Sequence, residues 1–111
     1  MPIYILRGRF TPDAVKGMLA KPENREDAVA KLFKSTGGKL IGWYLTMGRH
    51  DWLAIGEFPN EKAAASAILA AAAGGSLSDI ETTVAMTAKE AHATFEAASK
   101  AAKEFRSAGR A

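Results

Sequence analysis

The pair His50-Asp51 is the first place in this chain where neighbouring side chains could move a proton. An imidazole titrates near neutral pH, and a neighbouring carboxylate can orient it and stabilise its charged form. Adjacent residues of an extended chain point to opposite faces, so a direct contact between the two requires a turn. The alternative is structural: Asp51 accepts hydrogen bonds from turn amides, and His50 lies in solvent. His50 and Asp51 are thus candidate catalytic residues, with both interpretations open.

A second group of side chains could line a pocket for a small organic molecule. Tyr44 and Trp52 supply aromatic walls, and Thr46, Arg7 and Glu57 supply polar groups. Aromatic walls with a few polar groups are typical of small-molecule sites. The alternative is that the two rings belong to a subunit interface, where Tyr and Trp are also enriched. The candidate ligand-binding residues are Tyr44, Trp52, Thr46, Arg7 and Glu57.

The residue types give little support to metal or cofactor chemistry. The chain has no cysteine, which excludes thiolate nucleophiles, disulfides and Cys-ligated zinc or iron–sulfur sites. Glu96 follows His92 at helical spacing, but two ligands need a third from elsewhere, and a solvated helix face explains the pair better. The glycine pairs at 37–38 and 74–75 are isolated and form no phosphate-binding loop. We expect neither a metal nor a cofactor.

A predicted β-hairpin over residues 39–58 must position most of these side chains. Two runs rich in aromatic and β-branched residues meet at Gly48-Arg49-His50, which indicates a tight turn. With Met47 opposite Asp51, the face expected to pack against helices carries Ile41, Trp43, Leu45, Leu53 and Ile55. The other face carries Leu40, Gly42, Tyr44, Thr46, Trp52, Ala54, Gly56 and Phe58. A slip of one residue would exchange the cross-strand partners. The small residues of the second face predict that a ligand or another backbone approaches there closely.

The remaining elements follow from periodicity and from helix signals. Thr11 and Pro12 begin a short helix, and Pro22 interrupts the helical pattern. The expected strands are 3–9 and 80–86, and the expected further helices are 23–36, 61–73 and 88–107. Arg25 extends the apolar stripe of the main helix, either as a snorkelling side chain at the edge of the core or as a ligand-binding group.

The order β-α-β-β-α-β with a terminal helix predicts an α+β fold, the ferredoxin-like arrangement, with both main helices on one face of the sheet. The other face of such a sheet is left bare, and its aromatic residues need a cover. We therefore predict a homodimer or higher oligomer in which two such faces pack together as a dimeric α/β barrel.

The composition describes one ordinary globular domain. The chain has 111 residues, of which 48% are hydrophobic and 24% charged, and its formal net charge is +3. Nucleic-acid binding usually shows a denser basic stripe, so we expect no nucleic-acid partner. The N-terminus lacks a signal-peptide pattern, and the alanine-rich run over 63–73 is shorter than the roughly 20 residues that span a bilayer. We expect a soluble cytoplasmic protein without a membrane partner.

Several short features together form a family pattern. They are Gly37-Gly38 before a strand with Trp43-Tyr44, Gly48 and Asp51 around the turn, Glu57 and Pro59 after it, Gly75 behind the alanine-rich helix, and Thr83 in the last strand. With these features the sequence resembles the GYD domain family over residues 2–88, which suggests a domain at 1–88 and a helical extension at 89–111. One residue departs from the Gly-Tyr-Asp signature, because His50 stands where its tyrosine would be. The resemblance implies a ferredoxin-like dimeric barrel and no particular reaction.

Three functions are compatible with these residues. The first is a small dimeric barrel protein that binds a small organic ligand between the sheet and its partner subunit. The second is a cofactor-independent isomerase or monooxygenase-like enzyme that uses His50, Asp51, Tyr44 and Arg7, an analogy at the level of the fold alone. The third is an assembly subunit that uses the C-terminal helix.

Overall fold

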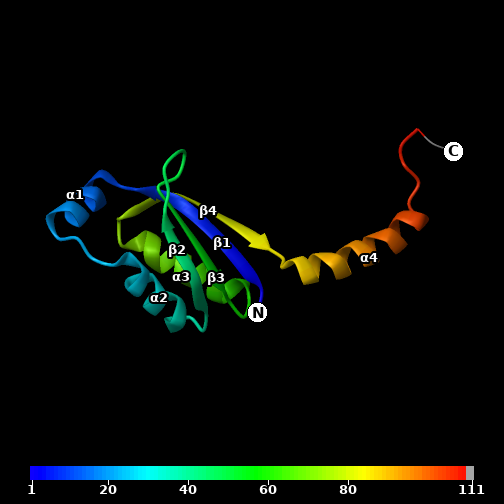
Figure 1. Cartoon of the computed structure of the whole chain (residues 1–111), viewed down its shortest axis with the longest axis horizontal. Coiled ribbons are helices and arrows are strands. Elements are labelled where there is room, and N and C mark those ends of the chain that lie inside the picture. The colour runs from blue at the N-terminus through cyan, green and yellow to red at the C-terminus, as the bar shows by residue number, and fades with distance from the viewer. Residues whose placement is uncertain (110–111) are drawn as a thin grey trace.

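The structure, a computed structural model of the chain, describes residues 1–109 and contains one antiparallel sheet with four helices among them (Figure 1). The strands are β1 (Ile3–Phe10), β2 (Lys39–Leu45), β3 (Trp52–Glu57) and β4 (Leu77–Ala85). The helices are α1 (Pro12–Ala20), α2 (Arg25–Ser35), α3 (Glu61–Ala73) and α4 (Ala88–Glu104). The strand β4 begins three residues earlier than predicted, and α4 ends before residue 107.

The strands lie in the order β2-β3-β1-β4, and every neighbouring pair is antiparallel. Helices α2 and α3 contact each other and pack on one face of this sheet (Figure 1). This arrangement confirms the predicted ferredoxin-like α+β fold.

Each helix begins where the sequence places a good N-cap. The side chains of Thr11, Asn24, Asn60 and Thr87 each accept a hydrogen bond from a backbone N–H of the first helical turn. Pro22 lies in the break between α1 and α2, as predicted. None of the described helices is long and apolar enough to cross a membrane.

The core lies between the sheet and helices α2 and α3. Phe58 is completely buried, and its ring centroid lies 4.8 Å from that of Phe33 and 5.7 Å from that of Tyr4. Gly56 allows this packing, because a Cβ atom there would lie 2.5 Å from Cε2 of Phe33. The group that approaches the small residue in β3 is therefore an aromatic side chain from α2.

The register of the hairpin differs by one residue from the predicted register. Leu45 pairs with Trp52, and the Thr46 N–H donates to the Asp51 carbonyl oxygen at 2.8 Å. The loop therefore comprises residues 47–50, one residue more than predicted, and the face assignment of β3 was wrong. Trp52, Ala54, Gly56 and Phe58 are buried on the helix-covered face, whereas Leu53 and Ile55 belong to the opposite face.

A β-bulge in β2 changes the assignment of that strand as well. Leu40 pairs with Gly56, but Gly42 pairs with Ile55, so Ile41 is an extra residue between them. Beyond the bulge, Trp43 packs against the core together with Leu40, contrary to the predicted grouping of Leu40 with the uncovered residues.

The face of the sheet opposite the helices is called the bare face below, because no described element packs on it (Figure 1). Alternation along the paired strands places on this face Ile3, Ile5, Arg7, Gly42, Tyr44, Leu53, Ile55, Glu57, Glu81 and Thr83. The Tyr44 ring lies over Gly42, where a Cβ atom would be 3.1 Å from the ring, and the side chain stays 56% exposed.

The terminal helix α4 projects away from the rest of the molecule (Figure 1). The extents of the whole molecule, α4 included, are 65 × 30 × 22 Å. Phe95 in α4 is 70% exposed, and Phe105, the residue directly after the end of α4, is 74% exposed. At its N-terminus the backbone N–H of Thr87 donates to the Glu90 carboxylate at 3.0 Å. This bond, followed by the contact with the Thr87 hydroxyl, holds the pKa of Glu90 below its usual value.

Candidate ligand-binding site

A cavity of about 250 Å³, called the inner cavity below, lies between the helix-covered face of the sheet and helices α2 and α3. Four aromatic side chains contribute to its wall, and they are Phe10, Phe33, Trp43 and Trp52. The rings of Phe10 and Trp43 lie 6.5 Å apart at an angle of 35°. On the α3 side the wall consists largely of alanines, including Ala67 and Ala71. Small side chains on the helix opposite large rings on the sheet leave room for a small molecule.

Few polar side chains line the inner cavity, and all of them can donate a hydrogen bond. They are the indole N–H groups of Trp43 and Trp52, the hydroxyl of Ser76 and the guanidinium of Arg25. Trp52 is only 5% exposed, and its Nε1 atom is buried without a hydrogen-bond partner in the described chain. Because protein atoms cover Nε1, this unmade hydrogen bond is a local cost of packing the core and not a contact for a molecule in the cavity.

A wider depression, called the outer depression below, adjoins the inner cavity. It lies between α1 and the turn from α3 to β4, has a volume of about 540 Å³, and shares Phe10, Arg25 and Ser76 with the inner cavity. Two hydrogen bonds of Thr11 fix its edge: the Thr11 N–H donates to the Ser76 carbonyl oxygen and the Thr11 hydroxyl to the Gly75 carbonyl oxygen, each at 3.0 Å.

Arg25 lies where the inner cavity and the outer depression meet. It is the first residue of α2, its side chain is 34% exposed, and it forms an ion pair with Glu23. The outer depression also contains Asp13 and Lys21, so its charged side chains include both signs. The predicted alternatives for Arg25, a snorkelling stem or a ligand-binding group, are compatible with each other at this position, because the stem borders the apolar wall and the head reaches solvent.

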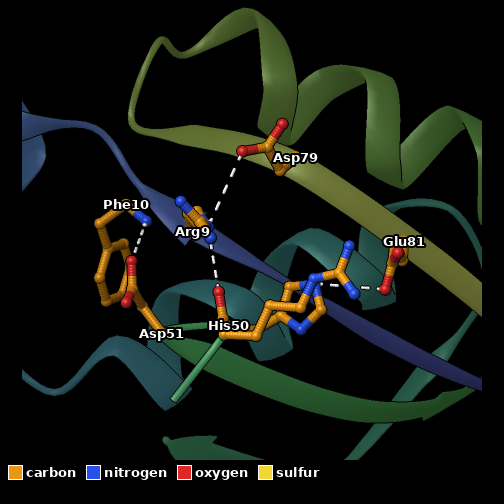
Figure 2. Close-up of polar contacts among 7 residues, drawn as sticks. Arg9, Phe10, His50, Asp51, Asp79 and Glu81 are labelled. Atoms are coloured by element: carbon orange, nitrogen blue, oxygen red, sulfur yellow. Dashed lines mark hydrogen bonds and ion pairs between the residues drawn. The ribbon is translucent and has the colours of Figure 1, made fainter. Parts of the chain in front are cut away.

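The candidate catalytic residues lie elsewhere, at the hairpin end of the sheet (Figure 2). Nε2 of His50 lies 3.2 Å from Oε2 of Glu81, and the His50 side chain is only 16% exposed. The carboxylate partner of His50 therefore comes from β4 rather than from Asp51. Arg7 in β1 lies opposite Glu81 in the register of β1 with β4. The Nε atom of Arg7 is buried without a hydrogen-bond partner in the described chain.

Asp51 has a structural contact instead. Its Oδ2 atom accepts a hydrogen bond from the backbone N–H of Phe10 at 2.9 Å (Figure 2). This bond and the Asp51 N–H, which donates to the Gly8 carbonyl oxygen at 2.8 Å, attach the hairpin to β1. Nearby, Nε of Arg9 donates to the Arg49 carbonyl oxygen at 3.0 Å. The Asp51 carboxylate thus has a structural contact, but its donor is the amide of another strand and not a turn amide, and His50 is largely buried and not in solvent.

The structure brings together only some of the predicted ligand-binding residues. Arg7, Thr46 and Trp52 border a shallow depression of about 190 Å³ together with His50. Tyr44 and Glu57 share the bare face with Arg7, but Glu57 pairs with Ile3 at the far end of that strand. Trp52 has its side chain in the core on the other face of the sheet, so the proposed grouping of Tyr44 with Trp52 was wrong.

Sequence analysis missed most of the inner cavity. Phe10, Trp43, Ile68 and Leu77 are ordinary core residues by type, and their periodicity gives no sign of a gap between them. The one available signal was the run of alanines in α3 opposite a sheet rich in aromatic residues. For metals, no group of three or more His, Cys, Asp or Glu side chains that could hold an ion occurs among residues 1–109, and His92 contacts only Glu96, at 3.0 Å.

The fold and this site together define a class: a ferredoxin-like α+β domain with an apolar cavity between its sheet and its helices. The model of the GYD domain matches residues 4–95, and the chain belongs to the GYD domain family. This confirms the family predicted from the sequence and extends the match into α4. Comparison with curated proteins finds no match.

Solved structures share the fold at low sequence identity. A protein from Thermus thermophilus is 13% identical with a TM-score of 0.53, and the match covers 79% of this chain and 96% of that one. A protein from Agrobacterium tumefaciens is 19% identical with a TM-score of 0.51, covering 79% and 94%. A transcriptional regulator from Neisseria meningitidis, solved in complex with L-Met, is 17% identical with a TM-score of 0.52, covering 78% of this chain and 51% of that one. At these identities the likeness shows the fold alone.

Proposed function

We propose that this protein binds a small, largely apolar organic molecule in the inner cavity. The observation that carries the proposal is a cavity of about 250 Å³ with four aromatic side chains in its wall and small alanine side chains on its α3 side. Apolar walls with a few placed polar groups are the usual composition of small-molecule sites. The proposal differs from the prediction from sequence in two respects: the ligand lies between the sheet and the helices of one chain, and of the predicted ligand-binding residues only Trp52 lines its site.

Two physical reasons favour an occupant over empty space. The side chains around a void lose dispersion contacts that a ligand would restore. The rings of Phe10 and Trp43 are tilted by 35° to each other, and such aromatic surfaces suit a flat or branched hydrocarbon body.

The test uses the two tryptophans of the chain, which both line the inner cavity. Titration with phenylbutanol should change tryptophan emission saturably and raise the melting temperature. Ala71→Phe places a ring in the cavity and should abolish both effects. Ala65→Phe is the matched control on the same helix, because Ala65 is exposed and does not line the cavity. Equal binding by both variants would contradict the proposed location, and no response from the unmodified protein would contradict the function.

We propose in addition that two copies of this chain associate through the bare face. This face has an apolar centre that includes Ile5, Leu53 and Ile55, with Arg7 near one end and Glu57 near the other. A two-fold contact of the face with itself would cover this apolar centre in both copies. The alternative assembly element is α4, whose Phe95 is exposed. Sedimentation equilibrium at micromolar concentration should give a dimer for the unmodified chain and for Phe95→Ser, because the bare face remains intact in that variant.

The second candidate function is proton transfer at the hairpin, without a cofactor. The observation that favours it is the contact of His50 with Glu81 at 3.2 Å beside the unpartnered Nε of Arg7. A carboxylate that orients an imidazole is a common general-base arrangement. If a reaction is found, His50→Gln should lower its rate by about 10²–10⁴-fold, and Asp51→Asn should leave it nearly unchanged. The reverse result would reassign the base to Asp51.

A further inference from the structure

The polar groups of the inner cavity restrict the chemistry of its ligand. The guanidinium of Arg25 and the indole N–H of Trp43 can only donate hydrogen bonds, and Ser76 can donate as well as accept. No carboxylate side chain lines the inner cavity among the described residues. A ligand that satisfies these donors must carry acceptors, and the one charged donor, Arg25, binds carboxylates with particular geometric fit.

We propose that the ligand is a small aromatic or branched carboxylic acid, bound with its hydrocarbon body in the inner cavity and its carboxylate on Arg25. This inference rests on the proposed function and specifies its ligand class. The position of Arg25 supports the orientation, because this side chain borders both the inner cavity and the outer depression. The acid group can therefore stay near water while the hydrocarbon body leaves it, which avoids the cost of burying a charge.

Glu23 is the group against which the ligand must compete. Its carboxylate already pairs with Arg25, and the two side chains are 53% and 34% exposed. Exposed ion pairs of this kind contribute little free energy, so a second carboxylate can replace Glu23. Of the other charged groups in the outer depression, Asp13 disfavours an incoming anion and Lys21 favours it. Arg25 thus provides the main attraction, and Glu23 weakens it.

The competition gives two substitutions with opposite effects. Arg25→Gln should weaken binding of phenylbutyrate about tenfold, because a charge-assisted bond is lost. Glu23→Gln should strengthen it about two- to threefold, because the competing carboxylate is gone. The neutral isostere phenylbutyramide should bind the unmodified protein about tenfold more weakly than phenylbutyrate, and neither substitution should change its affinity more than about twofold.

The measurement is the dissociation constant from tryptophan emission, with Arg49→Gln as the matched control. Arg49 is an arginine of the hairpin loop outside the inner cavity, so this variant removes the same charge without touching the site. A melting curve verifies that each variant is folded. Equal affinity for acid and amide, with no effect of Arg25→Gln, would overturn the inference and leave the proposed function intact. An equal loss in Arg49→Gln would overturn it as well, because net charge would then explain the result. Failure of both probes to bind would overturn the inference together with the proposed function.

Discussion

Gly56→Ala should destabilise the protein and weaken ligand binding at the same time. The new Cβ atom would lie 2.5 Å from Cε2 and 2.7 Å from Cδ2 of Phe33, whereas carbon atoms in contact prefer about 3.5–4.0 Å. The Phe33 ring must therefore retreat by about 1 Å. It is only 3% exposed and packs against Phe58 on one side, and it borders the inner cavity. A retreat into the cavity would reduce the space for a ligand.

The size of the effect follows from two opposing contributions. Overpacking a core costs about 1–3 kcal/mol, and the loss of glycine's freedom in the unfolded chain returns up to about 1 kcal/mol. The free energy of unfolding should thus fall by about 1–2 kcal/mol, which corresponds to a melting temperature lower by about 5–15 °C for a body of this size. Urea denaturation followed by tryptophan emission measures the free energy, and phenylbutyrate titration measures the affinity.

Two further variants make the result interpretable. Gly17→Ala is the matched control, because no atom lies within 4 Å of its added Cβ and the residue is helical. It should leave stability unchanged or raise it by up to about 1 kcal/mol. Phe33→Leu combined with Gly56→Ala should cost less than the sum of the two single substitutions, since the smaller side chain relieves the contact. A Gly56→Ala protein that is as stable as the original and binds phenylbutyrate equally well would refute the reasoning.

Three other predictions concern contacts outside the cavity. Asp51→Ala should lower the free energy of unfolding by about 1–3 kcal/mol, measured in urea, because the Phe10 N–H loses its carboxylate acceptor; unchanged stability would assign Asp51 another role. The pKa of Glu90 is lowered in the folded protein, so the ionised form of Glu90 stabilises the start of α4. This stabilisation is fully present above the usual glutamate pKa and is lost as the pH falls through the lowered pKa. Far-UV circular dichroism should therefore show helix loss on acidification in the original protein and a smaller acid-dependent loss in Glu90→Gln, and identical curves would contradict this. Ile55→Lys should convert the proposed dimer to a monomer in light scattering, because it places a charge at the centre of the bare face; a persisting dimer would exclude this face.

Much of the fold could be predicted because strong local signals agree with the final structure. Pro22 cannot continue a helix, and Thr11 and Asn60 cap helices in the structure. The hairpin register could not be predicted, because loops of three and four residues both fit the sequence around Gly48. Since both faces of the strand carry bulky apolar residues, the hydrophobic pattern did not select one register.

The candidate site was harder to predict for a different reason. The volume of the inner cavity depends on the distance between α3 and the sheet, which the one-dimensional pattern of Ala67 and Ala71 does not specify. The partner of His50 was also missed, because Glu81 comes from β4 and is distant in sequence. The acidic neighbour that the sequence suggested, Asp51, instead serves as an acceptor for β1.

The most direct test of the central claim is a heteronuclear NMR titration that follows the side-chain indole N–H signals. The chain has two tryptophans, so the spectrum contains one signal from Trp43 and one from Trp52. If phenylbutyrate enters the inner cavity, both signals should move saturably, because both indole rings border the cavity. The account would be contradicted if both indole signals stayed in place while the backbone amides of Leu53 and Ile55, on the bare face, shifted with the same saturation.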